Sequence, residues 1–327
     1  MERVLVTGVA GFIGSHLAEG LLGRGVAVTG VDSRSPASDP GAAENLAGLV
    51  GRHDFHLVVA DLVTADLTPL LEDVPVVFHL AAMAGVRRSW GDRFADYLAC
   101  NVIATQRLLE ACAAAEVPRL VAASSSSVYG HASTCPSRED DPLAPASPYG
   151  VTKLAAERLC AAYATRRQAS TSVVAMRYFT VYGPRQRPDM AISRILRAAM
   201  SGRGVPLYGD GRQRRDFTYV SDAVAATMAA ATADTQMAVV NVGSGRSTTL
   251  KEVLDLVAAI TGGAVPVLHR LDQPGDVEVT AADLTCAQEL LGYQPSTDLA
   301  AGLRQQWTWL TSRHHSSAHL IANAAGQ

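Results

Sequence analysis

The sequence predicts an α/β protein, with a doubly wound parallel sheet and a smaller C-terminal lobe. Short apolar runs recur along the first half of the chain, and stretches of helical periodicity separate most of them. Alternating strands and helices favour a parallel sheet with right-handed crossovers. Beyond Arg177 this alternation ends, and glycine, proline and arginine crowd residues 183–216. A chain of 327 residues is long enough for two domains, or for one large domain with an appended lobe.

Several of the apolar runs are predicted to be strands of the sheet, since a strand buried on both faces is apolar throughout. They cover residues 3–7, 26–31, 55–60, 74–80, 120–124 and 172–177. The periodicity between them predicts helices at 12–22, about 94–115 and about 147–167.

The second half of the chain is predicted to contain helices near 190–201 and 221–232 and a late strand at 239–242. We expect residues 1–176 to form the main domain, with a strand and a helix at about 237–262 returning to its sheet. The lobe then comprises 177–236 and 263–311. Residues 312–327 lack periodicity and are expected to form a frayed tail.

Charge and composition exclude several classes of protein. The net charge of −3 leaves no electrostatic footprint for nucleic acid or an anionic membrane. No apolar run approaches the roughly 18 to 20 residues of a membrane-spanning helix. No signal-peptide pattern opens the chain, so a cytoplasmic protein is expected. Five cysteines without a C-x-x-C pair predict reduced thiols, with neither a metal site nor a disulfide framework.

A glycine-rich turn lies between the first strand and the first helix. Gly8, Gly11 and Gly14 are spaced as G-x-x-G-x-x-G. The first permits a tight turn, the second lets a pyrophosphate approach the backbone, and the third lets the helix pack close to the strand. The helix that begins at Phe12 and Ile13 offers free N–H groups and a partial positive charge to the phosphates. In this strand-turn-helix context the glycines predict a dinucleotide site.

Acidic and small residues at the ends of the next strands extend this site. Asp32 ends the second strand, where its carboxylate can accept both adenosine ribose hydroxyls and repel a 2′-phosphate, which favours NAD over NADP. The residues after the third and fourth strands are placed to flank the adenine and the other ribose: Asp61, Leu62, Leu80, Ala81 and Ala82.

A second group of chemically active residues follows the fifth strand. Residues 124–130 read Ser-Ser-Ser-Ser-Val-Tyr-Gly and are expected at the carboxyl edge of the sheet, where ligands bind in such folds. Tyr149 and Lys153 are spaced to share one face of a helix. A nearby ammonium favours the phenolate and lowers the pKa of a tyrosine toward working pH. Alone this spacing usually marks a solvated helix face, but beside a dinucleotide site it predicts hydride-transfer chemistry.

With these landmarks in order, the chain resembles the extended short-chain dehydrogenase/reductases, a family that includes nucleotide-sugar epimerases and dehydratases. The resemblance covers about residues 2–310 and implies a Rossmann-type NAD-binding domain with a substrate-binding lobe. It implies that Ser125 binds the substrate hydroxyl and that Tyr149 is the catalytic base and acid. It further implies that Lys153 holds the nicotinamide ribose and lowers the pKa of Tyr149. Asn101 matches the family's structural asparagine and is expected among the cofactor-binding residues.

The side chains expected around the sugar distinguish the branches of this family. Sugar 4,6-dehydratases have Asp-Glu where this chain has Ser126 and Ser127, so the acid and base needed to expel a C6 hydroxyl are missing. UDP-glucuronate decarboxylases usually have a glutamate at the position of Ser127. Galactose-type 4-epimerases have Arg-Tyr-Phe-Asn, whereas this chain has Thr180 in place of the asparagine.

Three further stretches resemble UDP-glucuronate 4-epimerases: residues 84–89, 180–184 with 187–191, and 273–277. The resemblance places Arg87, Arg187 and Asp276 from these stretches on the substrate. Arg215 lies in a tract similar to the family's diphosphate-binding segment, and its guanidinium fork suits a phosphate. A solvated basic surface is an equal alternative for several of the arginines: Arg87, Arg88, Arg185 and Arg212.

The resemblance therefore implies a 4-epimerase that interconverts UDP-glucuronate and UDP-galacturonate by transient oxidation at C4 with bound NAD. Ser126, Ser127 and Thr180 are expected to hold the uronate carboxylate by neutral hydroxyls, with Arg187 as its charge partner. A 4-epimerase of a neutral UDP- or dTDP-hexose and a UDP-glucuronate decarboxylase stay open as alternatives. So does an inactive cofactor-sensing binding protein, although such proteins usually lose the Tyr or the Lys.

The expected partners are a UDP-sugar and a second copy of the chain. Family dimers pair the helices that correspond to about 94–115 and 147–167, so a homodimer is expected, although the same alanine and leucine content suits an intramolecular core. Nucleic acid and membranes are not expected as partners.

Overall fold

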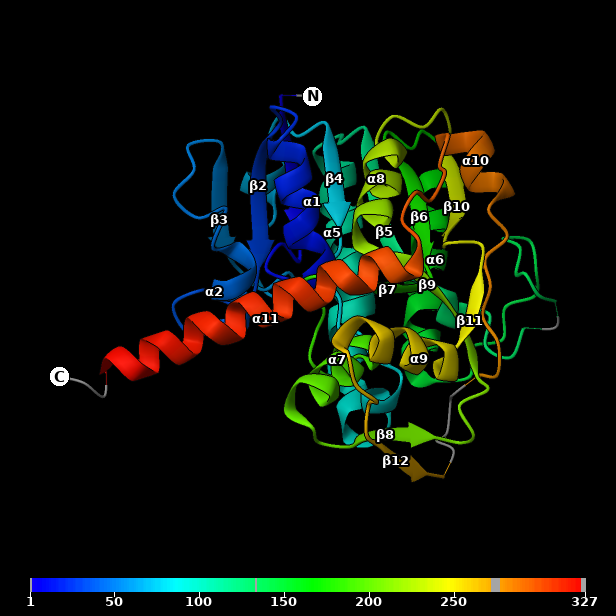
Figure 1. Ribbon diagram of the computed structural model, residues 1–327. Helices are drawn as coiled ribbons and strands as arrows, with labels where there is room; N and C mark the ends of the chain where they lie inside the picture. The colour runs from blue at the N-terminus through cyan, green and yellow to red at the C-terminus, as the bar shows by residue number, and fades with distance from the viewer. Residues whose placement is uncertain (1, 133, 272–276, 325–327) are drawn as a thin grey trace.

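The computed structural model describes residues 2–132, 134–271 and 277–324. Its main sheet consists of β1 (Arg3–Thr7), β2 (Ala27–Asp32), β3 (Phe55–Val59), β4 (Val76–His79), β5 (Arg119–Ser125), β6 (Ser172–Tyr178) and β10 (Met237–Val242). All pairs are parallel, in the order β10-β6-β5-β4-β1-β2-β3 (Figure 1). The chain reverses its direction of winding between β1 and β4, and ligands bind at such a point in doubly wound sheets. The predicted fold class is confirmed.

Helices cover both faces of this sheet. Those described are α1 (Phe12–Leu22), α2 (Pro40–Leu46), α3 (Thr68–Leu71), α4 (Phe94–Leu98), α5 (Ala104–Ala114), α6 (Pro148–Thr165), α7 (Ala191–Ser201), α8 (Val220–Ala230), α9 (Leu250–Thr261), α10 (Thr285–Leu291) and α11 (Leu299–Ala324). α1 and α8 share one core with Val4 and Val6 of β1, whereas α5 and α6 share another with Leu5. Alternate residues of a doubly buried strand therefore enter opposite cores, as its two-residue period requires.

The lobe contains two small sheets. Their strands are β7 (Thr180–Tyr182), β8 (Val205–Tyr208), β9 (Arg214–Tyr219), β11 (Ser247–Thr249) and β12 (Val267–Arg270). One sheet has the order β11-β9-β7, and in the other β12 pairs with β8. The predicted late strand is β10, which pairs with β6 in the main sheet. The helix expected to accompany it, α9, lies instead against α7 and α11, because it follows β11 directly and β11 pairs with β9 in the lobe.

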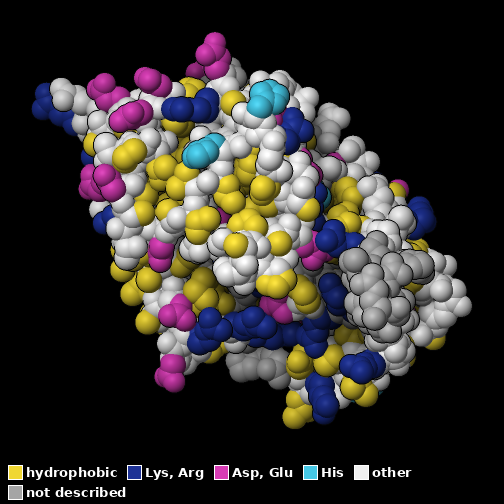
Figure 2. All heavy atoms as spheres, turned by 90° about the vertical axis from the view of Figure 1, so that its left-hand side faces the viewer, with side chains coloured by type: hydrophobic (Ala, Val, Ile, Leu, Met, Phe, Trp, Pro, Cys, Tyr) yellow, Lys and Arg dark blue, Asp and Glu magenta, His cyan; other side chains and the backbone are white. Residues whose placement is uncertain are grey.

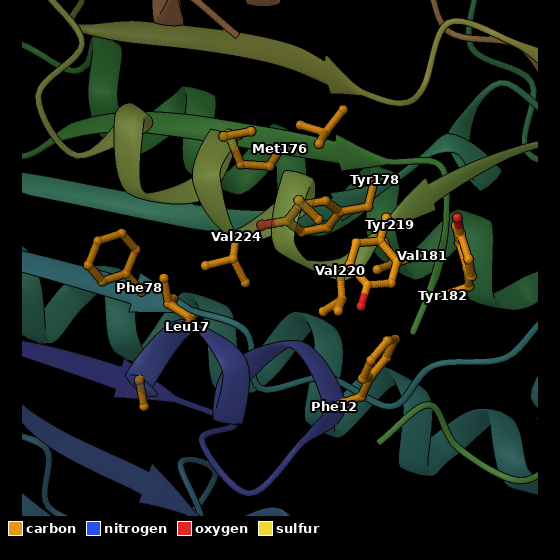
Figure 3. Close-up of a cluster of buried hydrophobic side chains, with 14 of the residues drawn as sticks. Phe12, Leu17, Phe78, Met176, Tyr178, Val181, Tyr182, Tyr219, Val220 and Val224 are labelled. Carbon is orange, nitrogen blue, oxygen red and sulfur yellow. The ribbon is translucent and has the colours of Figure 1, made fainter. Parts of the chain in front are cut away.

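One hydrophobic core joins the lobe to the main sheet. It contains Leu17 of α1, Phe78 of β4 and Met176 of β6, together with Tyr182 of β7 and Tyr219 of β9 (Figure 3). The two tyrosine rings meet edge to face with 5.4 Å between their centroids, a favourable geometry for buried aromatic side chains. The strands of the lobe that approach the main sheet are therefore held in fixed positions relative to it.

The C-terminal segment differs from the prediction of a frayed tail at 312–327. α11 continues as a helix to Ala324 and crosses from the lobe toward α2 (Figure 1). Arg313 forms an ion pair with Glu44 and lies over the ring of Trp309. Charged contacts of this kind leave no apolar periodicity in the sequence, so they could not be predicted. In the part of the chain that is described, no helix combines the length and the apolar character that a membrane crossing requires.

Candidate active site

The glycine-rich turn after β1 has the tight geometry that a dinucleotide site needs. Gly8 has a positive φ of 71°, and a Cβ atom there would lie 2.6 Å from the backbone nitrogen of Ala81. A Cβ atom on Gly14 would lie 2.2 Å from the carbonyl oxygen of Gly8, so only glycine allows α1 to start this close to the strand. Gly11 is the N-cap of α1, and no side chain caps this end. The first-turn N–H groups are therefore available to a phosphate.

Asp32 is buried at the end of β2, directly beside the turn. Its Oδ2 atom accepts the Ala10 N–H at 3.0 Å, and its Oδ1 atom accepts the Arg34 N–H at 3.0 Å. The Arg34 guanidinium also pairs with this carboxylate, with 3.2 Å between Nε and Oδ1. Arg34 was not singled out from the sequence, although its position two residues after Asp32 was visible there. A carboxylate at this strand end, beside an uncapped helix, fits the adenosine ribose and pyrophosphate of NAD.

The other predicted cofactor residues lie at the carboxyl ends of neighbouring strands. Ile13 lies in the first turn of α1, Asp61 and Leu62 follow β3, and Leu80, Ala81 and Ala82 follow β4. The side chains of Phe12 and Leu62 are buried in the two hydrophobic cores. These two residues can therefore contribute little more than backbone to a ligand.

Ser125, Tyr149 and Lys153 come together at the carboxyl edge of the sheet, although their segments are far apart in sequence. Ser125 ends β5, and Tyr149 and Lys153 lie on the first turns of α6. All three are buried, and the Ser125 hydroxyl is hydrogen-bonded to the Tyr149 phenol. Lys153 donates from Nζ to the carbonyl oxygen of Ala123 at 2.8 Å. The structure thus brings the predicted catalytic residues into one cluster.

Burial dominates the electrostatics of this cluster. Burial raises the pKa of the Tyr149 phenol, and the hydrogen bond to Ser125 and the charge of Arg187 offset this only in part. Burial reduces the pKa of Lys153 itself to about 8. In the protein alone the pKa of Tyr149 therefore lies above its ordinary value, and the lowering of that pKa by Lys153 stays a prediction. The pKa of Tyr149 is raised because desolvation disfavours the phenolate more than the nearby charges favour it.

Buried hydrogen bonds hold the catalytic helix against the sheet. Asn101 lies in a π-helical turn (Ala99–Ile103) that joins α4 to α5 and divides the single helix predicted at 94–115. Its side chain accepts the Met83 N–H at 2.8 Å and donates to Thr152 Oγ1 at 3.0 Å. Thr152 in turn donates to the carbonyl oxygen of Tyr149 at 2.8 Å. Asn101 therefore fixes the loop after β4 relative to Tyr149.

A buried ion pair supports the serine cluster from behind. Arg177 donates to both carboxylate oxygens of Glu157, at 2.6 and 3.0 Å, and the two side chains are each 2% exposed. Ser124 Oγ donates to the same carboxylate at 2.9 Å. Glu157 lies on α6, so this network fixes the end of β5 relative to the helix that carries Tyr149. Sequence inspection did not identify Glu157, because its partner is contributed by a distant strand.

The residues expected around the sugar lie beside the catalytic cluster. Ser126 and Ser127 form a 3-10 turn directly after Ser125, whose Oγ accepts the Ser127 N–H at 3.1 Å. Ser125 is in register with Tyr178 at the end of β6, and Thr180 follows on β7. Arg187 donates from Nε and Nη2 to Asp189, both at 3.0 Å, and from Nη1 to the carbonyl oxygen of Ala84 at 3.0 Å.

The remaining predicted substrate residues belong to the lobe or face it. The guanidinium of Arg87 lies 4.1 Å from the centroid of the Tyr208 ring, so it contacts β8 across the two parts of the molecule. Arg215 donates to the carbonyl oxygens of Arg214 and Glu278, at 2.9 and 3.2 Å. Asp276 lies outside the described residues. Figure 2 shows Lys and Arg side chains gathered in a band on one face of the molecule, a charge distribution that favours anionic ligands.

The loop after β4 is held to the catalytic helix by two residues that sequence reasoning did not assign. Ser89 Oγ accepts the Tyr149 N–H at 3.0 Å and donates to the carbonyl oxygen of Val86 at 2.7 Å. The Tyr97 ring meets that of Tyr149 edge to face at 6.2 Å, and its hydroxyl donates to the carbonyl oxygen of Gly85 at 3.0 Å. Both side chains are almost fully buried. Only the tertiary fold reveals these contacts.

Comparison with known proteins agrees with this geometry. The family model described as NAD dependent epimerase/dehydratase matches residues 4–243. An uncharacterised UDP-glucose epimerase of Bacillus subtilis (strain 168) is 43% identical over 314 residues, which is 95% of this chain and 98% of the relative.

Solved structures give the same assignment. MoeE5, solved with NAD and either UDP-glucose or UDP-glucuronic acid, is 47% identical, with TM-scores of 0.87 and 0.88 over 95% of this chain and 99% of that one. A UDP-glucuronic acid 4-epimerase of Bacillus cereus, in complex with UDP-glucuronic acid and NAD, is 38% identical, with a TM-score of 0.90 at the same coverage. The cofactor of this chain is NAD, and the epimerases of its family act on nucleotide sugars. The chain therefore belongs to the NAD dependent epimerase/dehydratase family.

Proposed function

We propose that this nucleotide-sugar epimerase interconverts UDP-glucuronate and UDP-galacturonate by inversion at C4. One observation carries the proposal: the residues next to Ser125 at the catalytic edge are the neutral Ser126 and Ser127, where dehydratases and decarboxylases use carboxylates. The B. cereus enzyme, named for this activity, and MoeE5, solved with UDP-glucuronic acid, support it.

Bound NAD would supply the acceptor for the C4 hydride and the donor for its return to the opposite face of the sugar. The turn at Gly8, Gly11 and Gly14 would hold its pyrophosphate, Asp32 the adenosine ribose, and Lys153 the nicotinamide ribose. Tyr149 removes the C4 hydroxyl proton and later gives it back, with Ser125 orienting the phenol by the hydrogen bond between them. Because burial disfavours the phenolate, ionisation of Tyr149 would depend on the hydrogen bond from Ser125 and on nearby positive charge such as that of Arg187.

Retention of the carboxylate is the special demand of a uronate. Oxidation at C4 creates a β-keto acid, which loses carbon dioxide when the C5–carboxylate bond aligns with the carbonyl π system. Hydroxyl donors from Ser126, Ser127 and Thr180 would hold the carboxylate out of that alignment. No acidic side chain stands at these positions to take part in elimination.

A 4-epimerase of a neutral UDP-hexose is the second candidate. The engagement of Arg187 by Asp189 favours it, since the guanidinium charge is partly neutralised before any substrate binds. The two candidates predict different effects of Arg187→Ala. For a uronate epimerase, kcat/KM should fall about tenfold or more with UDP-glucuronate and change little with UDP-glucose. Equal losses with both substrates would contradict a carboxylate-binding role.

A product assay tests the proposed function. Purified protein without added NAD is incubated separately with UDP-glucuronate, UDP-glucose and dTDP-glucose, and the products are separated by anion-exchange chromatography. We expect UDP-galacturonate as the main product and the highest kcat/KM with UDP-glucuronate. Chiefly UDP-pentose would indicate a decarboxylase, and turnover of the neutral sugars alone would favour the second candidate.

We further propose a homodimer formed through α4, the π-helical turn and α6. Large apolar side chains are exposed on these elements and in the loop just before α4: Trp90, Phe94, Leu98, Ile103 and Val151. Their fractional exposures are 37% to 48%, and exposed apolar side chains mark interaction sites where they gather. Pairing with the same helices of a second copy would bury them in a four-helix bundle.

A further inference from the structure

We propose that Asp189 is a specificity-determining positioning residue, which orients Arg187 and masks its charge, and so sets how strongly the site prefers a uronate to a neutral hexose. This inference rests on the proposed function of the site. Asp189 lies in the stretch 187–191 that resembles UDP-glucuronate 4-epimerases, but the sequence assigned it no role. It acts through Arg187.

The geometry of the pair is that of a two-pronged ion pair. Asp189 accepts from Nε and Nη2 of Arg187 through separate carboxylate oxygens, both at 3.0 Å. This occupies the edge of the guanidinium that would otherwise grip a substrate carboxylate in the same fashion. Arg88 adds a weaker contact, with 3.9 Å between its Nε and Asp189 Oδ2. The Asp189 carboxylate thus pairs with two arginines, so the net positive charge of this cluster is smaller than the two arginines alone would give.

A chain of hydrogen bonds fixes this pair relative to the reacting centre. Arg187 Nη1 donates to the Ala84 carbonyl oxygen at 3.0 Å. The next two carbonyl oxygens, of Gly85 and Val86, accept from Tyr97 and Ser89 respectively. Ser89 also accepts the Tyr149 N–H. Three successive carbonyl oxygens of this loop are therefore fixed by hydrogen bonds. The loop that holds Arg187 is the same one that holds α6, the helix with Tyr149.

The charge of the pair reaches the site. Arg187 is the cation whose field acts on the Tyr149 phenol and favours its ionised form. Burial acts to raise the pKa of Asp189, but the hydrogen bonds and charge of Arg187, with Arg88, hold it below its usual value. Asp189 is therefore a carboxylate at neutral pH. A uronate carboxylate that approaches Arg187 meets this negative charge, whereas a neutral hexose does not.

Asp189→Asn tests the inference, because it removes the charge with little change in shape. The chain offers a matched control in Arg52 and Asp54, which have the same two-residue spacing and two-pronged pairing, at 2.9 and 2.8 Å, just before β3 and away from the site. Dissociation constants for UDP-glucuronate and UDP-glucose are measured by calorimetry on the NAD-loaded protein, alongside kcat/KM for each.

We expect Asp189→Asn to shift the ratio of the two dissociation constants about three- to tenfold toward UDP-glucuronate, as for removal of a partly screened like charge. Asp54→Asn should leave the ratio unchanged. In an Arg187→Ala background the shift should be smaller, because the part of it that Asp189 exerts through Arg187 is then lost. An unchanged ratio, or a shift toward UDP-glucose, would overturn the inference. Binding is measured for both ligands, whichever of them the enzyme turns over. Failure of the proposed function would therefore be seen in the product that the wild-type enzyme forms. Failure of this inference would be seen in the ratio of the two dissociation constants.

Discussion

The phenol of Tyr149 must ionise in surroundings that oppose ionisation. Burial raises its pKa, and the Ser125 hydroxyl and the charge of Arg187 are the groups that lower it. The spacing of Tyr149 and Lys153 predicted their proximity correctly. It could not predict the balance between desolvation and charge, because that depends on side chains from β5 and the loop after β7 that pack around the ring.

Replacement of Ser125 tests this balance. Ser125→Ala should lower kcat about 10²-fold, as for loss of one preorganised donor, and should move the acid limb of the pH profile of kcat/KM to higher pH. Ser125→Thr keeps the hydroxyl and should retain most of the activity. An alanine variant with the wild-type kcat and an unmoved acid limb would show that the hydrogen bond to Tyr149 is unimportant.

His79 gives a second prediction at this scale. Its ring bridges Thr7 and Thr105, at 2.8 and 2.9 Å, and burial, with the charge of Lys153, lowers its pKa to about 3. In the unfolded chain the pKa of this histidine is ~6.5. The neutral ring therefore stabilises the folded protein fully above that pH, and this contribution is lost as the pH falls toward the pKa of His79 in the folded protein. Between pH ~7 and pH ~5 the free energy of unfolding should fall about 2 kcal/mol further in the wild type than in His79→Gln. Denaturant titrations that fall equally in both proteins would contradict this assignment.

The elements of the main domain were largely predictable. Its strands are mostly apolar and its first helix is periodic, so the predicted limits of these elements lie close to those observed. The π-helical turn at Ala99–Ile103 was not predictable, since one inserted residue barely disturbs a helical period. The lobe was predicted only in outline, because most of its strands have only three or four residues and lie among glycines and prolines, where no usable pattern forms.

The start of α6 is an element whose two caps have different roles. Ser147 accepts the Gly150 N–H at 3.1 Å from within the helix's own segment, whereas Ser89 accepts the Tyr149 N–H from the loop after β4. Ser147→Ala should destabilise the protein by about 1 kcal/mol, with little change in kcat. Ser89→Ala should destabilise it by about 1–3 kcal/mol and also lower kcat, since it frees the loop that holds Arg187. Equal kcat values for the two variants, each measured at the same interval below its own melting temperature, would argue against a positioning role for Ser89.

At the scale of the whole molecule, the shared core makes the lobe part of the site. Tyr182 and Tyr219 pack into the same hydrophobic cluster as Leu17 and Phe78. Thr180 and Arg187 are therefore held in fixed positions relative to the carboxyl edge of the main sheet. The contact between Arg187 and Ala84 joins residues 103 positions apart. Motifs located the residues at strand ends, but contacts at such separations could not be inferred from one sequence.

The proposed dimer predicts a change in mass. Leu98→Glu should shift the protein toward a monomer in sedimentation velocity, because it places a charge in the buried centre of the interface. Val50→Glu is the control, since Val50 is 57% exposed outside these helices. A wild-type protein that is monomeric at micromolar concentration, or a Leu98 variant that remains dimeric, would contradict the proposal.

The central claim is inversion at C4 with the carboxylate retained. It is tested most directly by incubating the purified protein with UDP-glucuronate deuterated at C4, in ordinary water and without added NAD, and following the products by NMR. UDP-galacturonate that keeps its deuterium at C4 is the expected result, because the hydride leaves and returns within one active site. Release of carbon dioxide with a UDP-pentose product, or exchange of the deuterium with solvent, would contradict the claim.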